Sequence, residues 1–222
     1  MQERQTHPVD EASLEQFLTY CHRRSFPKKA IIIRPGDPAE TLLYIISGSV
    51  TVSVEDDDGH ELILAYLNSG DFIGEMGLFS KVHQREVMVR SRLPCELAEI
   101  GYARLNNLFE TQLKDAYPHI MFALGAQLTR RLLHTSRKVS RLAFLDVTGR
   151  VARTVLDLCE EPDAMSHPEG TQIKISRQEI SRIVGCSREM VGRVLKILEE
   201  QGSVSVSGKT IVVREDGDIA TL

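Results

Sequence analysis

Residues 176–196, SRQEISRIVGCSREMVGRVLK, have the pattern of two short helices joined by a tight turn. Ser176 and Glu179 have the spacing of a capping box, in which a Ser hydroxyl and a Glu carboxylate each bind an unpaired amide at a helix start. Gly185 can end this helix, because glycine adopts the left-handed conformation at least cost, and Ser187 can cap the next one. This short spacing predicts a helix-turn-helix.

The second helix of this pair has the composition of a base-reading helix. One side is apolar, with Val191, Val194, Leu195 and Leu198, and the other carries Arg188, Glu189, Gly192, Arg193 and Lys196. Arginine can pair with guanine, glutamate can accept from the cytosine amino group, and Gly192 lets the helix backbone approach the groove. These features favour DNA recognition over the alternative, an ordinary solvated helix face.

Bulk composition is that of a globular protein with two modest domains: 222 residues, 42% hydrophobic and 26% charged. No apolar run approaches the ~20 residues of a membrane span, and the first residues lack a signal-peptide core, so we expect a cytoplasmic protein without membrane contact. The four cysteines lie far apart, without zinc-site spacing, so we expect reduced structural cysteines and no metal.

Charge is divided unevenly along the chain. The net charge is −4, but residues 137–214 hold 13 Lys and Arg against 10 Asp and Glu. The basic segment is the one that carries the helix-turn-helix. Because this excess is small, DNA affinity should depend on dimeric, groove-specific contacts as well as on charge.

Short β-branched and aliphatic runs fill residues 30–102 and are separated by turn residues. Gly36, Gly48, Gly59 and Gly70 follow one another at intervals of 11 or 12 residues, which predicts an all-β sandwich or small barrel. Asp58-Gly59 is a strong hairpin signal. The acidic run 55–58 is interpreted as a solvated hairpin tip rather than a cation site.

Residues 118–145 change to a helical period. A mostly apolar seam, with members three or four residues apart, consists of Met121, Leu124, Leu128, Leu132, Thr135, Val139 and Leu142. A parallel homodimer along this seam is the favoured interpretation, and packing against the chain's own β domain is the alternative. The polar pair Thr135 and Ser136 would then specify register or face a ligand at the dimer axis. Beyond residue 146, a helix, a short strand, the helix-turn-helix and two β runs about Ser207-Gly208 predict a winged helix.

A second chemical feature is GDFIGEMGLF, residues 70–79, followed by Arg85. Glycines would let the backbone fold closely around a ligand, a short helix start would offer amides to an anion, and Arg85 would supply a guanidinium for phosphate. Glu75 would accept hydrogen bonds from ribose hydroxyls. A glycine-rich corner of the sandwich is the alternative interpretation.

These parts, in this order, resemble the cyclic AMP receptor protein (CRP/FNR) family of bacterial transcription regulators over nearly the whole chain. The matching motifs are GEMGLF, residues 141–156, DAMSHPEG, SRQEI and VGCSREMVGRVLK. The resemblance implies an α+β fold: a jelly-roll-like cyclic-nucleotide-binding domain over 1–116, a dimerisation helix over 117–145 and a winged helix-turn-helix domain over 146–222.

The resemblance also implies site residues. Nucleotide binding would involve Gly74, Glu75, Arg85, Thr135 and Ser136. Arg188, Glu189 and Arg193 would read the bases of TGTGA-type half-sites in a palindromic double-stranded DNA site. The other residues that we expect to contact DNA are Ser176, Arg177, Gln178, Ser187 and Lys196. RNA polymerase would be contacted by the loop residues Ala164, Ser166, His167, Glu169 and Gly170, and by a second patch of His22, Arg24 and Arg104.

One position departs from the cyclic-AMP-sensing pattern. That pattern has Ser after the phosphate-binding Arg, where this chain has Glu86, which we add to the nucleotide site. This change and the longer segment TQLKDAYPH are similar to a branch of the family that responds to cyclic di-GMP and binds DNA without ligand. Glu86 could also pair with Arg85 and close the pocket. We therefore expect cyclic di-GMP or no effector, with cyclic AMP disfavoured and a cyclic-AMP-activated regulator as the alternative.

Other function classes have less support. We expect no covalent cofactor, and an iron-sulfur sensor is disfavoured because the N-terminal cysteine cluster is absent. An enzyme is disfavoured because the chain lacks a Walker lysine motif and metal-ligand spacing. A DNA packager with weak sequence preference is a third hypothesis.

Overall fold

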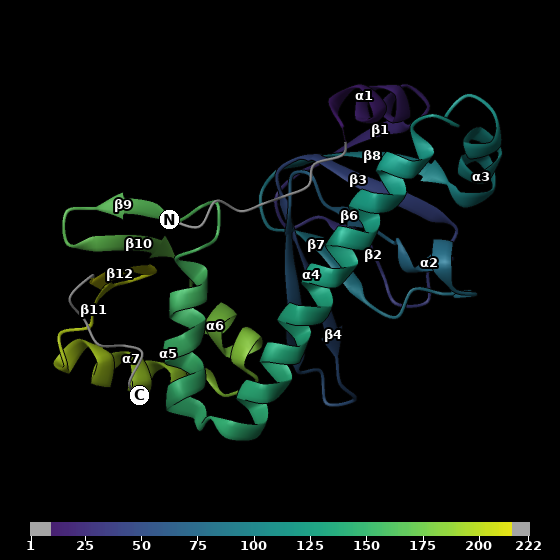
Figure 1. Cartoon of the computed structure of the whole chain (residues 1–222). Helices are drawn as coiled ribbons and strands as arrows, with labels where there is room; N and C mark the ends of the chain where they lie inside the picture. The colour runs from purple at the N-terminus through teal and green to yellow at the C-terminus, as the bar shows by residue number, and fades with distance from the viewer. Residues whose placement is uncertain (1–9, 215–222) are drawn as a thin grey trace. The chain divides into compact units, whose positions relative to one another are not determined.

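The computed structural model describes residues 10–214. Two compact units divide the chain: among the described residues, the first takes 10–54 and 63–135, and the second takes 55–62 and 136–214. Figure 1 labels most of their helices and strands.

The first unit is built on two four-stranded sheets. One has the order β1-β8-β3-β6, with β1 His22–Phe26, β8 Cys95–Gly101, β3 Thr41–Ser47 and β6 Phe72–Ile73. The other has the order β2-β7-β4-β5, with β2 Ile31–Ile33, β7 Met88–Ser91, β4 Ser49–Glu55 and β5 Glu61–Asn68. The predicted β sandwich is therefore confirmed, as is the Asp58-Gly59 hairpin, where Gly59 has φ +80°.

Four helices belong wholly or partly to this unit: α1 Glu11–Thr19, α2 Met76–Phe79, α3 Tyr102–Glu110 and the first part of α4 Tyr117–Phe144. The core has two layers. Leu43 and Ile45 of β3 face the second sheet, whereas Leu42 and Tyr44 pack under α1, α3 and α4. Because both faces of β3 are covered, its sequence TLLYIIS is apolar almost throughout instead of alternating.

Helix α4 has a different apolar face from the one expected. Leu124 is fully buried in the core of its own unit, and Met121 packs against that core. The predicted continuous dimer seam is therefore wrong in its first turns, where the alternative of packing on the β domain holds. The exposed large apolar side chains of α4 are Tyr117, Phe122, Leu132, Leu133, Val139, Leu142 and Phe144.

The second unit contains α5 Val147–Leu158, α6 Arg177–Val184 and α7 Arg188–Glu200. A four-stranded sheet of order β11-β12-β10-β9 accompanies them, with β9 Met165–His167, β10 Gly170–Lys174, β11 Val204–Ser207 and β12 Thr210–Arg214. Asp146 caps α5 by accepting from Gly149 N at 2.8 Å, and Arg141 of α4 forms a bidentate ion pair with Asp157 of α5. The predicted winged helix is confirmed.

Candidate DNA interface and nucleotide loop

Local hydrogen bonds hold the two helices of the helix-turn-helix as the sequence predicts. Ser176 Oγ accepts from Glu179 N at 3.1 Å at the start of α6, and Ser187 Oγ accepts from Met190 N at 3.2 Å at the start of α7. Gly185 ends α6 in the left-handed conformation, with φ +70° and ψ +52°. Each cap satisfies an amide that would otherwise lack a partner, so both helices begin at defined residues.

Helix α7 separates its residues as a recognition helix requires. Val191, Val194, Leu195 and Leu198 are buried, whereas Arg188, Glu189, Arg193 and Lys196 are exposed. A Cβ on Gly192 would lie 3.7 Å from Arg177 Cδ, which is ordinary contact. No neighbour among the described residues therefore requires a glycine at this position.

The other candidate DNA contacts lie at the starts of the same helices. Arg177 and Gln178 are exposed in the first turn of α6, Ser187 is exposed, and Ser176 is half-buried. The hairpin between β11 and β12 turns at Ser207-Gly208, as predicted, and Glu199 of α7 accepts from Val206 N at 2.9 Å. The wing is thereby tied directly to the recognition helix.

In the predicted nucleotide loop, the side chains of Arg85 and Tyr102 bond to each other and to backbone oxygens of the protein. Arg85 donates through Nη2 to Thr41 O and through Nη1 to Tyr102 OH at 3.3 Å, and Tyr102 OH donates to Gly74 O. A Cβ on Gly74 would lie 2.5 Å from Arg85 Nη1, and one on Gly77 would lie 2.5 Å from the Tyr102 ring. The close approaches that these glycines permit are therefore made by Arg85 and Tyr102, where the sequence suggested a ligand.

The short helix α2 uses some of its first amides internally. Gly77 N donates to Gly74 O, and Leu78 N donates to Glu75 O. Burial raises the pKa of Tyr102, so its phenol stays protonated and remains a donor to Gly74 O at neutral pH.

Glu75 is only 3% exposed and forms an ion pair with Arg131 of α4. Arg131 also donates through Nη2 to Phe72 O at 2.6 Å. Gln127 of α4 also bonds Phe72 of this loop. The loop partners that the sequence did not indicate are Thr41, Tyr102, Gln127 and Arg131. For Arg131 alone the sequence held a signal: it lies one helical turn before Thr135, a residue that we expected in the nucleotide site.

The remaining predicted nucleotide residues are exposed: Glu86 in the loop before β7, and Thr135 and Ser136 on α4. In the described part of the chain, the Arg85 guanidinium is bonded to Thr41 and Tyr102. The structure thus does not support the expected pairing of Arg85 with Glu86, because the Arg85 fork points toward β3 and α3.

Both candidate polymerase surfaces are accessible. In the first, Ser166 and Glu169 are exposed while Ala164, His167 and Gly170 are half-buried. Glu169 N donates to His167 Nδ1 at 3.2 Å, which shapes a tight turn between β9 and β10. His22, Arg24 and Arg104 of the second patch are exposed on β1 and α3, with Arg24 paired to Glu99 at 2.9 Å.

The acidic hairpin is a hydrogen-bonded turn. Asp56 Oδ1 accepts from Asp58 N at 3.0 Å and His60 N at 2.8 Å, and Oδ2 lies 3.2 Å from His60 Nδ1. The bond from His60 N is the largest cause that lowers the pKa of Asp56. Asp56, Asp58 and His60 lie close enough together to hold a cation, but all three are exposed and the turn accounts for their arrangement.

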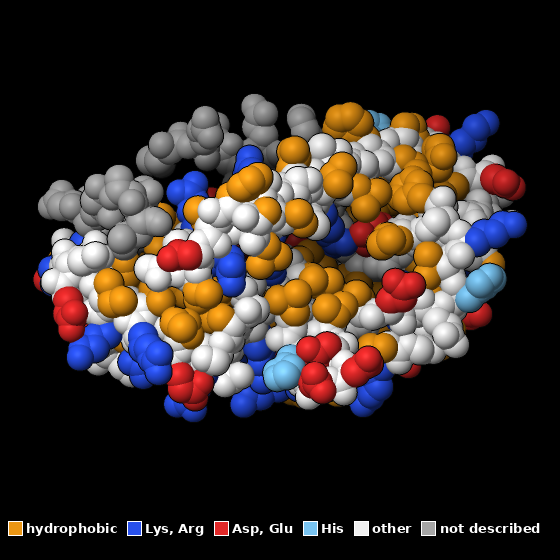
Figure 2. All heavy atoms as spheres, turned by 90° about the horizontal axis from the view of Figure 1, so that it is seen from below, with side chains coloured by type: hydrophobic (Ala, Val, Ile, Leu, Met, Phe, Trp, Pro, Cys, Tyr) orange, Lys and Arg blue, Asp and Glu red, His pale blue; other side chains and the backbone are white. Residues whose placement is uncertain are grey.

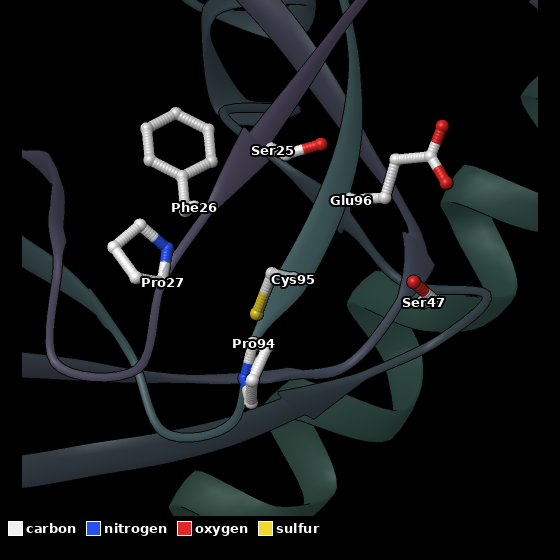
Figure 3. A pocket seen from close by; sticks show the side chains of 7 residues that line it. All are labelled: Ser25, Phe26, Pro27, Ser47, Pro94, Cys95 and Glu96. Carbon is white, nitrogen blue, oxygen red and sulfur yellow. The ribbon is translucent and has the colours of Figure 1, made fainter.

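A hollow of about 410 Å³ lies at the end of β3 away from Thr41 and its contact with Arg85 (Figure 3). Ser25, Phe26, Pro27, Ser47, Pro94, Cys95 and Glu96 line it. Thr41, which contacts Arg85, begins β3 and Ser47 ends it, so the part of β3 that Arg85 contacts and the part that lines the hollow are about 20 Å apart. The hollow is thus separate from the Arg85 contact, although the loop itself begins at Gly70, which donates to Ile45 O of β3.

The four cysteines, Cys21, Cys95, Cys159 and Cys186, are free, as expected. Burial raises the pKa of Cys21 to about 12 and that of Cys159 to about 11. These thiols therefore stay protonated at neutral pH and act as small apolar groups. Within residues 10–214, none of the helices combines the length and apolar character that a bilayer crossing requires.

Comparison with known proteins agrees with this division of the chain. A cyclic nucleotide-binding domain model matches residues 23–112, and a Crp-like helix-turn-helix domain model matches residues 149–217. The CRP-like protein Clp of Xanthomonas campestris pv. campestris is 56% identical over 205 residues, which cover 92% of this chain and 89% of Clp. The chain belongs to the CRP/FNR family of transcription regulators.

Solved structures support the same fold. One described as the c-di-GMP responsive global regulator CLP of Xanthomonas campestris is 56% identical, has a TM-score of 0.88 and covers 92% of this chain and 99% of that one. A CRP/FNR family regulator from Thermus thermophilus is 23% identical, with a TM-score of 0.74 and coverage of 90% and 97%. The first supports membership of the family and the second the fold alone. The chain is a DNA-binding transcription regulator and, as predicted, not an enzyme.

Proposed function

We propose that the chain acts as a homodimer that binds palindromic promoter sites with TGTGA-type half-sites and contacts RNA polymerase. The observation that carries this proposal is the exposed face of α7, where Arg188, Glu189 and Arg193 stand away from the buried stripe. Arginine and glutamate in this arrangement can read guanine and cytosine in the major groove.

The surface charge supports groove-specific recognition. On the face that Figure 2 shows, both Lys or Arg and Asp or Glu side chains are spread over the surface. This mixture and the net charge of −4 for the whole chain give weak non-specific attraction to DNA phosphates, so specific contacts and two half-sites must supply the affinity.

The effector that we propose is cyclic di-GMP, acting on a protein that binds DNA without ligand. The description of the CLP structure as c-di-GMP responsive supports this choice. In the loop, Arg85 already has protein partners and Glu86 adds an exposed negative charge next to it in sequence, which together disfavour cyclic AMP at Arg85; cyclic di-GMP would have to bind through other contacts. A cyclic-AMP-activated regulator is the second candidate, favoured by the match to a cyclic nucleotide-binding domain.

Fluorescence anisotropy with a labelled TGTGA palindrome tests the proposal. We expect nanomolar binding by the ligand-free protein, a change in affinity with cyclic di-GMP and little change with cyclic AMP. A scrambled duplex of the same length and charge is the control. Equal binding to both duplexes would favour the DNA packager, and DNA binding that requires cyclic AMP would favour the second candidate.

Substitution of Arg188 tests base reading itself. Arg188→Ala should lose about 1–3 kcal/mol of discrimination at one guanine, because a bidentate pair is removed. The melting temperature should stay near that of the wild type, since the side chain is exposed. If binding to all duplexes weakened equally, Arg188 would be a phosphate contact.

A further inference from the structure

The edge of the first sheet is completed by a side chain of helix α4. Strand β6 lies at the edge of its sheet, and Phe72 is paired in register with Tyr44 of β3. Gln127 of α4 accepts from Phe72 N at 2.7 Å and donates to Phe72 O at 2.9 Å. The Gln127 amide thus bonds both backbone groups of Phe72, as a neighbouring strand would.

This contact is buried and belongs to a longer line of anchors. Gln127 is 2% exposed and Phe72 is 1% exposed. Within one turn of α4, Arg131 donates to the same Phe72 O and pairs with Glu75, and Arg130 lies 3.7 Å from Asp71. The segment 71–75, which is the first part of the nucleotide loop, is therefore held by three polar positions of α4.

The geometry leaves little freedom for α4 to slide or rotate. A shift of one residue along a helix moves a side chain by about 1.5 Å and turns it by about 100°. Hydrogen bonds tolerate only a few tenths of an ångström before they weaken, so such a shift would break both bonds of Gln127. The buried N–H of Phe72 would then lack its partner, which is costly.

We propose that Gln127 is a positioning residue that fixes the axial register of α4 on strand β6, so that movement of Phe72 is passed to the exposed apolar face of α4. This face is defined by Phe122, Leu132 and Leu133. The inference rests on the proposed dimerisation through α4, and it assigns to Gln127 the link between the nucleotide loop and that interface.

Gln127→Met tests the inference, because it keeps a similar volume and removes both hydrogen bonds. We expect exchange of the Phe72 amide hydrogen to become at least about ten-fold faster and the dimer dissociation constant, measured by sedimentation, to rise about ten-fold or more. Ala123→Gly is the matched control. It lies on the same buried face and lowers helix stability without changing these bonds, so its dimer dissociation constant should stay within about three-fold of the wild type.

Gln127→Glu provides a rescue that a merely space-filling role would not show. The glutamate accepts from Phe72 N at any pH but donates to Phe72 O only when protonated. The charged groups near this position are Arg131 and Glu75, and then Arg130 and Asp71. Burial raises the pKa of a carboxyl group above its usual value of about 4.3, so dimer affinity of this variant should rise toward that of the wild type as the pH falls from about 8 to about 5. The ratio of the dimer dissociation constant of Gln127→Met to that of the wild type should stay constant over the same range.

Each result has a definite meaning. Wild-type dimer affinity in Gln127→Met, or equal weakening in Ala123→Gly, would overturn the positioning role while leaving the proposed function intact. A wild-type protein that is monomeric and yet binds the palindrome would instead overturn the proposed dimerisation through α4, and the inference with it.

Discussion

At the scale of single residues, Gly192 separates the needs of the fold from those of DNA binding. A Cβ there meets only ordinary contact with Arg177, and the residue lies inside helix α7. Gly192→Ala should therefore stabilise the protein by up to about 1 kcal/mol, because alanine has the higher helix propensity. The same methyl group should weaken operator binding by holding α7 away from the groove.

Thermal unfolding and anisotropy measure these two effects of Gly192→Ala independently. Lys114→Ala, an exposed change outside both helices of the helix-turn-helix, serves as the control and should alter neither quantity. An alanine variant that binds the operator as tightly as the wild type would remove the argument for close backbone approach.

Glu86 is the residue on which effector choice should depend. Two like charges about 4 Å apart repel by about 1 kcal/mol in water and about 4 kcal/mol at the effective dielectric of a protein surface. Glu86→Ser should therefore raise affinity for cyclic AMP by roughly one to three decades, measured by calorimetry. His83→Ser changes an exposed residue of the same loop without removing a carboxylate, so it should not show this gain.

The sequence was most informative where partners are close along the chain. The Ser176 and Ser187 caps join residues three apart, and both were predicted correctly. Glu75 and Arg131 are 56 positions apart, and Arg85 and Thr41 are 44 apart. A single sequence contains no periodic signal for pairs that are so far apart. It therefore suggested that the glycine-rich loop surrounds a ligand, and it did not indicate that Arg85 and Tyr102 contact these glycines.

At the scale of elements, α4 shows why a helical period predicts a helix better than it predicts what the helix contacts. Leu124 and Leu132 fit one seam in the sequence, but Leu124 is fully buried against the sheet and Leu132 is 68% exposed. Apolar residues at threes and fours arise whether a helix packs on its own domain or on a second copy. Helix α4 packs on its own domain through one face, and its exposed apolar face is the one available to a second copy.

The exposed face of α4 gives the prediction for dimerisation. Leu132→Asp with Leu133→Asp should yield monomers by light scattering, because the two charges would have to be buried in an apolar interface. Loss of the dimer should also weaken operator binding, since two recognition helices must be held one helical turn of DNA apart.

His134→Asp is the matched control for this double variant, because it adds a charge at an exposed position on the opposite side of α4. It should remain dimeric. A Leu132→Asp, Leu133→Asp protein that also stays dimeric would place the interface on another element.

At the scale of the whole molecule, DNA binding and activation should be separable, because the turn between β9 and β10 lies apart from α7 in the sequence and is shaped by its own contacts. Glu169 N bonds His167, and Gly170 has φ +145° where a Cβ would lie 2.0 Å from Val213 O. Exposed turns held rigidly on a scaffold often carry partner contacts. Changes to the exposed side chains here should therefore alter a surface without altering the fold.

Ser166→Ala with His167→Ala should leave operator affinity unchanged and lower transcription by purified RNA polymerase from a promoter that the protein activates. His167→Ala removes the acceptor of Glu169 N, but this amide is in an exposed residue where water can replace the imidazole. The turn should survive, because Pro168 and Gly170 are retained and the backbone pairing of β9 with β10 does not use side chains. Lys114→Ala, exposed in the other unit, should leave both quantities unchanged. If operator affinity fell together with transcription, the turn would belong to the DNA interface. If transcription were unaffected, the polymerase contact would have to lie elsewhere, and the patch of His22, Arg24 and Arg104 would be the next surface to test.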